Sequence, residues 1–117
     1  MSLDVYLIED SGEHPGSGIY IREEVYEANI THNLDEMAQA AGIYECVWRP
    51  REHGFVFAKD IVPTLKQGID RLRESPDTFK VFDAENGWGT YEQFVPWLEH
   101  YLAACEQHPM AEIRVSR

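Results

Sequence analysis

Residues 25–43 read VYEANITHNLDEMAQAAGI and pass from a strand pattern to a helix pattern with no loop between them. Tyr26, Ala28 and Ile30 alternate with polar side chains, which predicts a β-strand with one buried face. The polar face of that strand carries Glu27, Asn29 and Thr31. We therefore expect the strand to end in a polar junction immediately before a helix.

The helix that follows carries a start signal and a stop signal. Asn33 suits the N-cap, and Glu36 lies three residues later, where it can complete a capping box. Gly42 is placed to end the helix as the C′ residue, and Ile43 supplies the hydrophobic contact that commonly follows. The buried stripe is predicted to consist of Leu34, Met37, Ala38 and Ala41.

Further strands are expected at both ends of the chain. Residues 3–8 are apolar on both faces, which indicates a central strand, and residues 9–18 contain the glycines, proline and serines typical of a loop. Residues 19–21 begin a second strand, and 25–31 either continue it or form a third. Residues 111–115 alternate, which predicts a half-buried last strand with Ile113 and Val115 pointing inward.

Two longer helices are predicted in the second half of the chain. The first covers about 60–74, with Asp60 as N-cap, Pro63 in the first turn and Gly68 at a close approach to another element. Its buried stripe is predicted to be Ile61, Leu65, Ile69 and Leu72. The second begins at Thr90, which forms a capping box with Gln93. Its stripe is predicted to be Phe94, Leu98, Tyr101 and Cys105, with a kink or later start at Pro96 and an end at His108-Pro109.

The remaining segments have weaker patterns. Residues 44–48 fit either an extra helical turn or a buried strand, and 49–54 form a polar loop. Residues 75–89 show no helical period, and we expect their aromatic side chains, Trp88 included, to pack on the body of the protein. Strands at the front and the end with helices between them predict an α+β fold. We expect one domain, 1–117, with a small antiparallel or mixed sheet of three or four strands and about three helices on one face.

The composition limits the classes of partner. The chain has 117 residues and a net charge of −11, with ten acidic residues and one basic residue in 1–48. A protein this acidic repels phosphate backbones and anionic membrane surfaces, so we expect no direct nucleic-acid or membrane binding. The start of the sequence lacks the basic residues of a signal peptide. The lack of a signal-peptide pattern, together with only two cysteines that lie far apart in the sequence, indicates a cytoplasmic protein.

No motif indicates a metal site or a catalytic nucleophile. The five histidines and two cysteines show no Cys-x-x-Cys or His-x-x-x-His spacing, so we expect no metal and no cofactor. Cys105 lies on a helix stripe and Cys46 between Tyr44 and Trp48, and free cysteines in such places are usually core residues. A Cys46–His53 pair is the alternative that the spacing leaves open.

Two polar segments are candidates for a ligand site. In the first, a strand end carrying Asn29 and Thr31 runs into His32 and Asn33, and asparagine is unfavourable inside strands. In the second, two glycines precede a helix and could expose amide groups to an anion. Trp48-Arg49 joins an aromatic anchor to a guanidinium, as interface hot spots do. The candidate ligand-binding residues are Asn29, Thr31, His32, Asn33, Trp48, Arg49, Asn86, Gly87, Trp88, Gly89 and Thr90.

These motifs carry a resemblance. Asn-Ile-Thr-His-Asn at 29–33, Ile-Val-Pro-x-Leu at 61–65 and a glycine turn into a helix ending in His-Pro resemble small uncharacterised proteins of bacteriophage and actinobacterial genomes. Those proteins carry Asn-Ile-Thr-Tyr-Asn, so His32 replaces their tyrosine. The resemblance covers 3–8 and 25–115 and implies a phage or prophage setting without an activity.

The sequence predicts a non-enzymatic binding module for a small polar or anionic ligand, with Trp48 or Trp88 as a stacking wall. One alternative is an acidic protein-interaction module, such as an inhibitor of a host protein, that meets a basic partner through its N-terminal half and Trp48-Arg49. Another is a small enzyme that uses His32 or His53 as acid or base. A homodimer is also compatible with the aromatic content of 12%.

Overall fold

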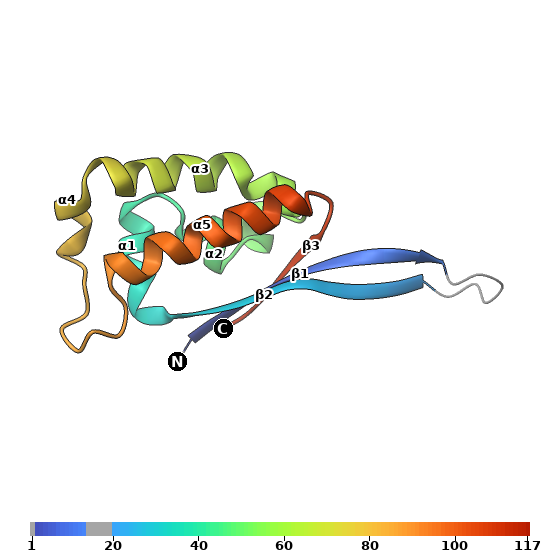
Figure 1. The fold of residues 1–117 in the computed structure, drawn as a ribbon, viewed down its shortest axis with the longest axis horizontal. Helices are drawn as coiled ribbons and strands as arrows, with labels where there is room; N and C mark the ends of the chain where they lie inside the picture. Colours follow the sequence, from blue (N-terminus) through green and yellow to red (C-terminus); the bar gives the residue numbers. More distant parts are fainter. Residues whose placement is uncertain (1, 14–19) are drawn as a thin grey trace.

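The computed structural model describes residues 2–13 and 20–117 and has the predicted α+β architecture (Figure 1). Three antiparallel strands form one sheet in the order β2-β1-β3, so β1 is central as predicted. The strands are β1 (Ser2–Glu13), β2 (Tyr20–Thr31) and β3 (Glu112–Ser116). The described residues contain no helix long and apolar enough to span a bilayer.

The β1–β2 hairpin is longer than the sequence pattern predicted. Residues 9–13, expected to lie in a loop, continue β1, because they pair with β2 as far as Glu13↔Tyr20. Residues 14–18 of that predicted loop lie outside the described residues. Residues 25–31 continue β2 and are not a separate strand, although Val25 is an extra residue, since Leu7 faces Tyr26 and Ile8 faces Glu24. Such a β-bulge bends and twists the strand that carries it.

The last strand joins only the first half of the hairpin. β3 pairs with β1 from Asp4↔Ser116 to Ile8↔Glu112 and no further. Beyond that point β1 and β2 continue as a two-stranded ribbon that projects past the helices (Figure 1). We call residues 9–13 and 20–24 the hairpin arm. It contributes to an elongated molecule of 57 × 27 × 23 Å.

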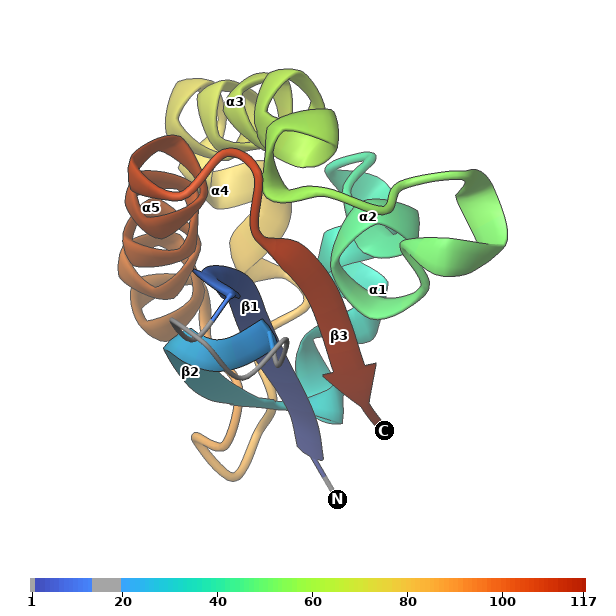
Figure 2. The ribbon, with the colours of Figure 1, turned by 90° about the vertical axis from the view of Figure 1, so that its right-hand side faces the viewer.

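The helices lie on one face of the sheet, as predicted, but there are more of them than the three expected (Figure 2). Those in the described residues are α1 (Asp35–Ala40), α2 (Tyr44–Trp48), α3 (Ala58–Glu74), α4 (Pro76–Lys80) and α5 (Tyr91–Gln107), with 3-10 turns at His32–Leu34 and Arg51–His53. Residues 44–48 are thus helical, and the polar loop at 49–54 contains a 3-10 turn. α3 and α5 pack side by side above the sheet.

The sheet face beneath the helices forms one side of the core. Leu3, Val5, Leu7 and Ile113 are fully buried there, and Val115 is half-buried. The opposite face of β1 is half-exposed, contrary to the expected burial on both sides, because no helix of the described residues covers it. All predicted apolar stripe positions of the helices are buried, namely Leu34, Met37, Ala38, Ala41, Ile61, Leu65, Ile69, Leu72, Phe94, Leu98, Tyr101 and Cys105.

One close contact fixes α3 against the α1–α2 turn. A β-carbon added to Gly68 would lie 2.1 Å from Cγ2 of Ile43, which is well inside van der Waals contact. Gly42 ends α1 with a positive φ of 77°, and the Ile43 amide donates back to the Ala38 carbonyl. The predicted helix end and the predicted close approach at Gly68 are therefore two sides of the same packing contact.

The helix starts differ from two of the predicted caps. Thr31, not Asn33, caps the first turn, and its Oγ1 accepts from the Asn33 amide at 3.2 Å. Asp60 is not an N-cap but lies in the first turn of α3, where its carboxylate accepts from the Val56 and Phe57 amides. Asp60 satisfies the same orphan donors that an N-cap would satisfy, from a position three residues later.

α5 has the predicted cap, end and buried stripe, but not the later start that Pro96 offered as an alternative. Thr90 and Gln93 form the predicted capping box, and the helix ends at His108. α5 begins at Tyr91 without a later start and continues through Pro96, whose ring is exposed. The preceding segment contains the unpredicted α4, and of its expected packing residues Phe79 is buried and Trp88 is not.

Candidate functional site

The two polar segments singled out in the sequence lie side by side. The end of β2 and the turn before α5 line a groove of about 450 Å³. A second hollow of about 380 Å³ continues from it past Asn33 and Ser2. We call the first the tryptophan groove; it is lined by Asn29, Ile30, Thr31, Gly87, Trp88, Gly89, Gln93 and Trp97.

The wall formed by Trp88 is exposed but held in place. Its side chain is 72% exposed, whereas large aromatic side chains gain roughly 1.5–3 kcal/mol from full burial. The Trp88 amide donates to Asn86 Oδ1 at 3.0 Å, and the Trp88 carbonyl accepts from Asn33 Nδ2 at 2.7 Å. The turn therefore presents an indole ring to solvent on a backbone that is fixed on both sides.

Gly89 allows this turn to approach β2. Its φ is +114°, and an added β-carbon would lie 3.0 Å from Cβ of Asn33 and 3.1 Å from Cγ2 of Thr31. A residue with a side chain at this position would have a strained backbone and would clash with Asn33 and Thr31. Glycine is therefore required here to bring the turn and the strand end together.

The amide groups of the turn before α5, which the sequence predicted to be open to an anion, already donate to acceptors of the protein itself. The amides of Gly89 and Thr90 both donate to Gln93 Oε1 at 3.1 Å. The Gly87 amide donates to the Ala84 carbonyl, and the Trp88 amide is taken by Asn86. With its donors used internally, the turn gives an anion no set of free amides to bind.

The strand end keeps part of its hydrogen-bonding capacity. Asn29 Nδ2 donates to Asp4 Oδ1 at 2.6 Å and to Ser2 Oγ at 2.9 Å. A carboxylate cannot donate, so these contacts fix the orientation of the amide and leave Asn29 Oδ1 as an acceptor. Thr31 Oγ1 accepts from the Asn33 amide, which leaves its hydroxyl proton available to a guest. The site thus offers one acceptor and one donor beside the Trp88 ring.

Trp97 also lines the groove and was not among the predicted site residues. Its Nε1 donates to the backbone carbonyl of Asn29 at 3.0 Å, and its ring lies 5.6 Å from that of Tyr101. Gln93 and Ser2 were also missed as site residues. The sequence places Trp97 beside a helix stripe, which signals packing, and gives no sign that it also borders the groove.

Five predicted residues line neither the groove nor the hollow beside it: Asn86 and Thr90 lie in the turn itself, and Trp48, His32 and Arg49 lie away from it. Trp48 is 2% exposed and donates from Nε1 to His32 Nδ1 at 3.0 Å, so it forms part of the core and cannot be a stacking wall or an interface anchor. His32 uses Nδ1 as an acceptor in that bond, which places the ring proton on Nε2. Arg49 bonds to the Tyr44 hydroxyl and pairs with Glu52.

The two cysteines are core residues, as predicted. Both are buried, and burial raises the pKa of the Cys46 thiol and of the Cys105 thiol to about 12. Such thiols are not thiolates at neutral pH and do not act as nucleophiles. Among the described residues, no group of three or more His, Cys, Asp or Glu side chains could hold a metal ion.

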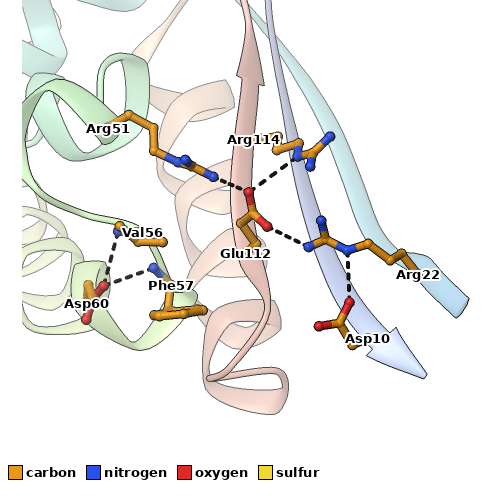
Figure 3. Close-up of polar contacts among 8 residues, drawn as sticks. All are labelled: Asp10, Arg22, Arg51, Val56, Phe57, Asp60, Glu112 and Arg114. Atoms are coloured by element: carbon orange, nitrogen blue, oxygen red, sulfur yellow. Dashed lines mark hydrogen bonds and ion pairs between the residues drawn. The ribbon is translucent and has the colours of Figure 1, made fainter. Parts of the chain in front are cut away.

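A second polar cluster lies at the base of the hairpin arm (Figure 3). The Glu112 carboxylate contacts Arg22 of β2 at 2.5 Å, Arg51 of the 3-10 turn, and Arg114 of β3 at 3.5 Å. The hydrogen bond from Arg22 is the main cause that lowers the pKa of the Glu112 carboxyl. Arg22 also pairs with Asp10 at 2.9 Å. The cluster joins the arm to β3 and to the loop before α3.

No family model, no curated protein and no solved structure matches the chain.

Proposed function

We propose that this protein is a non-enzymatic binding module and that the tryptophan groove holds a small, uncharged polar ligand with a flat face. The observation that carries the proposal is the exposed Trp88 ring on a fixed turn, in a groove that Trp97 and the free acceptor of Asn29 also line. Sites for small molecules combine apolar walls with a few placed polar groups. The stacking wall of the site is Trp88.

The charge around the groove favours a neutral ligand over an anion. The turn amides are occupied, the eight groove-lining residues include no charged side chain, and the nearest carboxylate in the hydrogen-bond network is Asp4. A phosphate or carboxylate would have to give up its hydration without a cation or a free amide to replace it. A sugar or nucleoside ring offers hydroxyl groups and a flat apolar face without that cost.

The test is a titration of the protein with a panel that separates ring from charge. We expect glucose, N-acetylglucosamine or adenosine to shift the NMR signals of the Trp88 indole and the Asn29 side-chain amide. The matched anions glucose 6-phosphate and AMP should bind more weakly than their neutral partners. Tighter binding of the phosphorylated compounds, or shifts that avoid both residues, would show that this function is wrong.

Two variants locate the site. Trp88→Ala should abolish the shift of the Asn29 amide, and Trp88→Phe should retain part of it because a smaller aromatic face remains. Val81→Ala is the control, since Val81 is 76% exposed in the same segment but does not line the groove. A ligand that binds Trp88→Ala as tightly as the unmodified protein would place its site elsewhere.

The cytoplasmic location and the phage or prophage setting stay part of this proposal. The alternative of an acidic interaction module loses its predicted anchor, because Trp48 is buried and Arg49 is engaged with Tyr44 and Glu52. The N-terminal half of the chain is still strongly acidic, and several of its acidic side chains lie on the hairpin arm, which projects into solvent.

A further inference from the structure

The outer half of β1 has an unpaired backbone edge. β3 pairs with β1 only as far as Ile8↔Glu112, so among the described residues no strand continues that row beside residues 9–13. The other edge is paired with β2 at Glu9, Asp10 and Glu13, with an irregularity between Asp10 and Glu13. An unpaired edge presents a row of amide and carbonyl groups that can pair with another chain. The free position begins beyond residues 109–111, which lead into β3 and of which Pro109 and Met110 lie beside Glu9 and Asp10.

A partly apolar hollow lies beside this edge. It has a volume of about 480 Å³ and is lined by Glu9, Asp10, Phe57, Pro109 and Met110. Phe57 is 37% exposed and Met110 is 60% exposed, and they are two of the four large hydrophobic side chains exposed in the described part of the chain. A side chain from an added strand can therefore enter an apolar contact where the backbone edge begins.

The charge at this edge is unbalanced. Glu9 lies directly opposite Glu23 in the β1–β2 register, and Glu24 follows beside it. Like charges directly opposite each other on a sheet are destabilising. His108 Nδ1 lies 2.7 Å from Glu9, whereas Glu23 and Glu24 form no ion pair with another described residue. A basic side chain on an added strand would stand next to Glu9 and offset this repulsion.

The arm is held in position for such a contact. Asp10 and Arg22 pair across the ribbon, and Arg22 continues to Glu112, which Arg51 also holds (Figure 3). These contacts tie the base of the arm to β3 and to the loop before α3. A preorganised edge loses less conformational entropy when it binds than a free hairpin would.

From these observations we infer that the free edge of β1 at residues 9–13 binds an extended segment of a basic partner protein. The segment would add to the sheet beyond the turn that leads into β3, with a Lys or Arg within reach of Glu9 and an apolar side chain against Phe57 and Met110. Main-chain hydrogen bonds would supply affinity and the side chains specificity. A second copy of this arm fits poorly, because it would bring further carboxylates against Glu9 and Glu23. This surface is separate from the tryptophan groove.

The test uses a synthetic probe, the peptide acetyl-Lys-Leu-Lys-Val-Lys-Leu-amide. We expect it to shift the backbone amide NMR signals of residues 9–13 and to slow their hydrogen exchange. Two control peptides separate charge from strand pairing: one replaces Lys by Glu, and one carries N-methyl groups on alternate backbone amides. Both controls should fail to bind. Equal binding of the N-methylated peptide would reduce the effect to unspecific charge attraction and overturn strand addition.

Protein variants complete the design. Glu9→Gln should weaken the Kd of the probe by about two- to fivefold, the range that an opposite-charge cross-strand pair contributes, and Met110→Ser should weaken it further. Glu74→Gln, which removes an exposed charge at the far end of α3, should leave the Kd unchanged. Equal losses in all three variants, or dimerisation of the protein through the arm in sedimentation experiments, would contradict the inference.

Discussion

The two halves of the β1–β2 hairpin share one hydrogen-bonded ladder but are stabilised in different ways. In residues 2–8 the inward side chains Leu3, Val5 and Leu7 are buried beneath the helices. In residues 9–13 no helix covers the ribbon, and charged side chains such as Asp10 and Arg22 take over. An isolated two-stranded ribbon is marginal in water. The arm therefore depends on its ion pairs and on the covered half from which it extends.

The strongest test of this difference is to weaken the covered half. Leu7→Ala removes a fully buried side chain from the centre of the sheet and should lower the free energy of unfolding by about 2–5 kcal/mol. Ile8→Ala is the matched control on the opposite, half-exposed face and should cost much less. Urea denaturation measures both values. Equal losses would mean that the two faces of β1 are buried alike.

A substitution in the core beneath β2 tests whether a buried polar group in the covered half lacks a hydrogen-bond partner. The Tyr101 hydroxyl is buried without a hydrogen-bond partner in the described part of the chain, and burial raises its pKa well above the ordinary range. Tyr101→Phe removes this unsatisfied group and should stabilise the protein by about 1–3 kcal/mol.

The control for Tyr101→Phe is Tyr91→Phe, because the Tyr91 hydroxyl donates to the Leu72 carbonyl at 2.8 Å. This variant should lose about 1 kcal/mol. The two melting temperatures should move in opposite directions. A fall in both would show that the Tyr101 hydroxyl is satisfied in solution.

The ion cluster at the base of the arm predicts a pH dependence. The contacts with Arg22 and Arg51 lower the pKa of Glu112 in the folded state, so its stabilising effect is complete above the unfolded value near 4.3. This effect is lost as the pH falls through the lower folded pKa. Glu112→Gln should therefore cost about 1 kcal/mol at pH 7 and almost nothing at pH 2. Urea denaturation at both pH values checks this, and an equal cost at both would exclude the ionic explanation.

The smallest expected effect lies in the arm itself. Glu23→Lys places a cation opposite Glu9 and should stabilise the ribbon by about 0.2–1 kcal/mol, seen as slower amide exchange in residues 9–13. Glu27→Lys makes the same charge change opposite Tyr6, so it relieves no directly opposed acid. If both variants slow exchange equally, the arm responds to net charge rather than to the opposed pair.

The sequence predicted what local patterns determine. The α+β class, the central position of 3–8 and every helix stripe depend on the alternation of apolar residues, and the structure has them all. The extension of β1 to Glu13 depends on pairing with β2 at Glu9, Asp10 and Glu13, which local residue preferences do not encode. Asn33 has an N-cap's chemistry, but Thr31 caps the turn and Asn33 reaches across to Trp88.

The candidate site was predicted in part for the same reason. Asn29, Thr31 and the Gly87–Gly89 turn line one groove, although nothing in their spacing places two segments so far apart in sequence together. Trp48 and Trp88 look alike as aromatic residues beside loops, yet one is sealed in the core and the other is open to solvent. Which tryptophan is buried depends on the tertiary packing of α2, and the apolar pattern of 44–48 does not specify it.

The pairing of Asp4 with Ser116 has a practical consequence. Neighbouring strands lie about 4.8 Å apart, so the chain enters and leaves the sheet at almost the same point, at the opposite end from the arm (Figure 1). The whole unit could therefore be grafted into a surface loop of a carrier protein through two short tethers, with the arm directed away from the carrier. Its two candidate contact surfaces could then be studied on a scaffold of known behaviour.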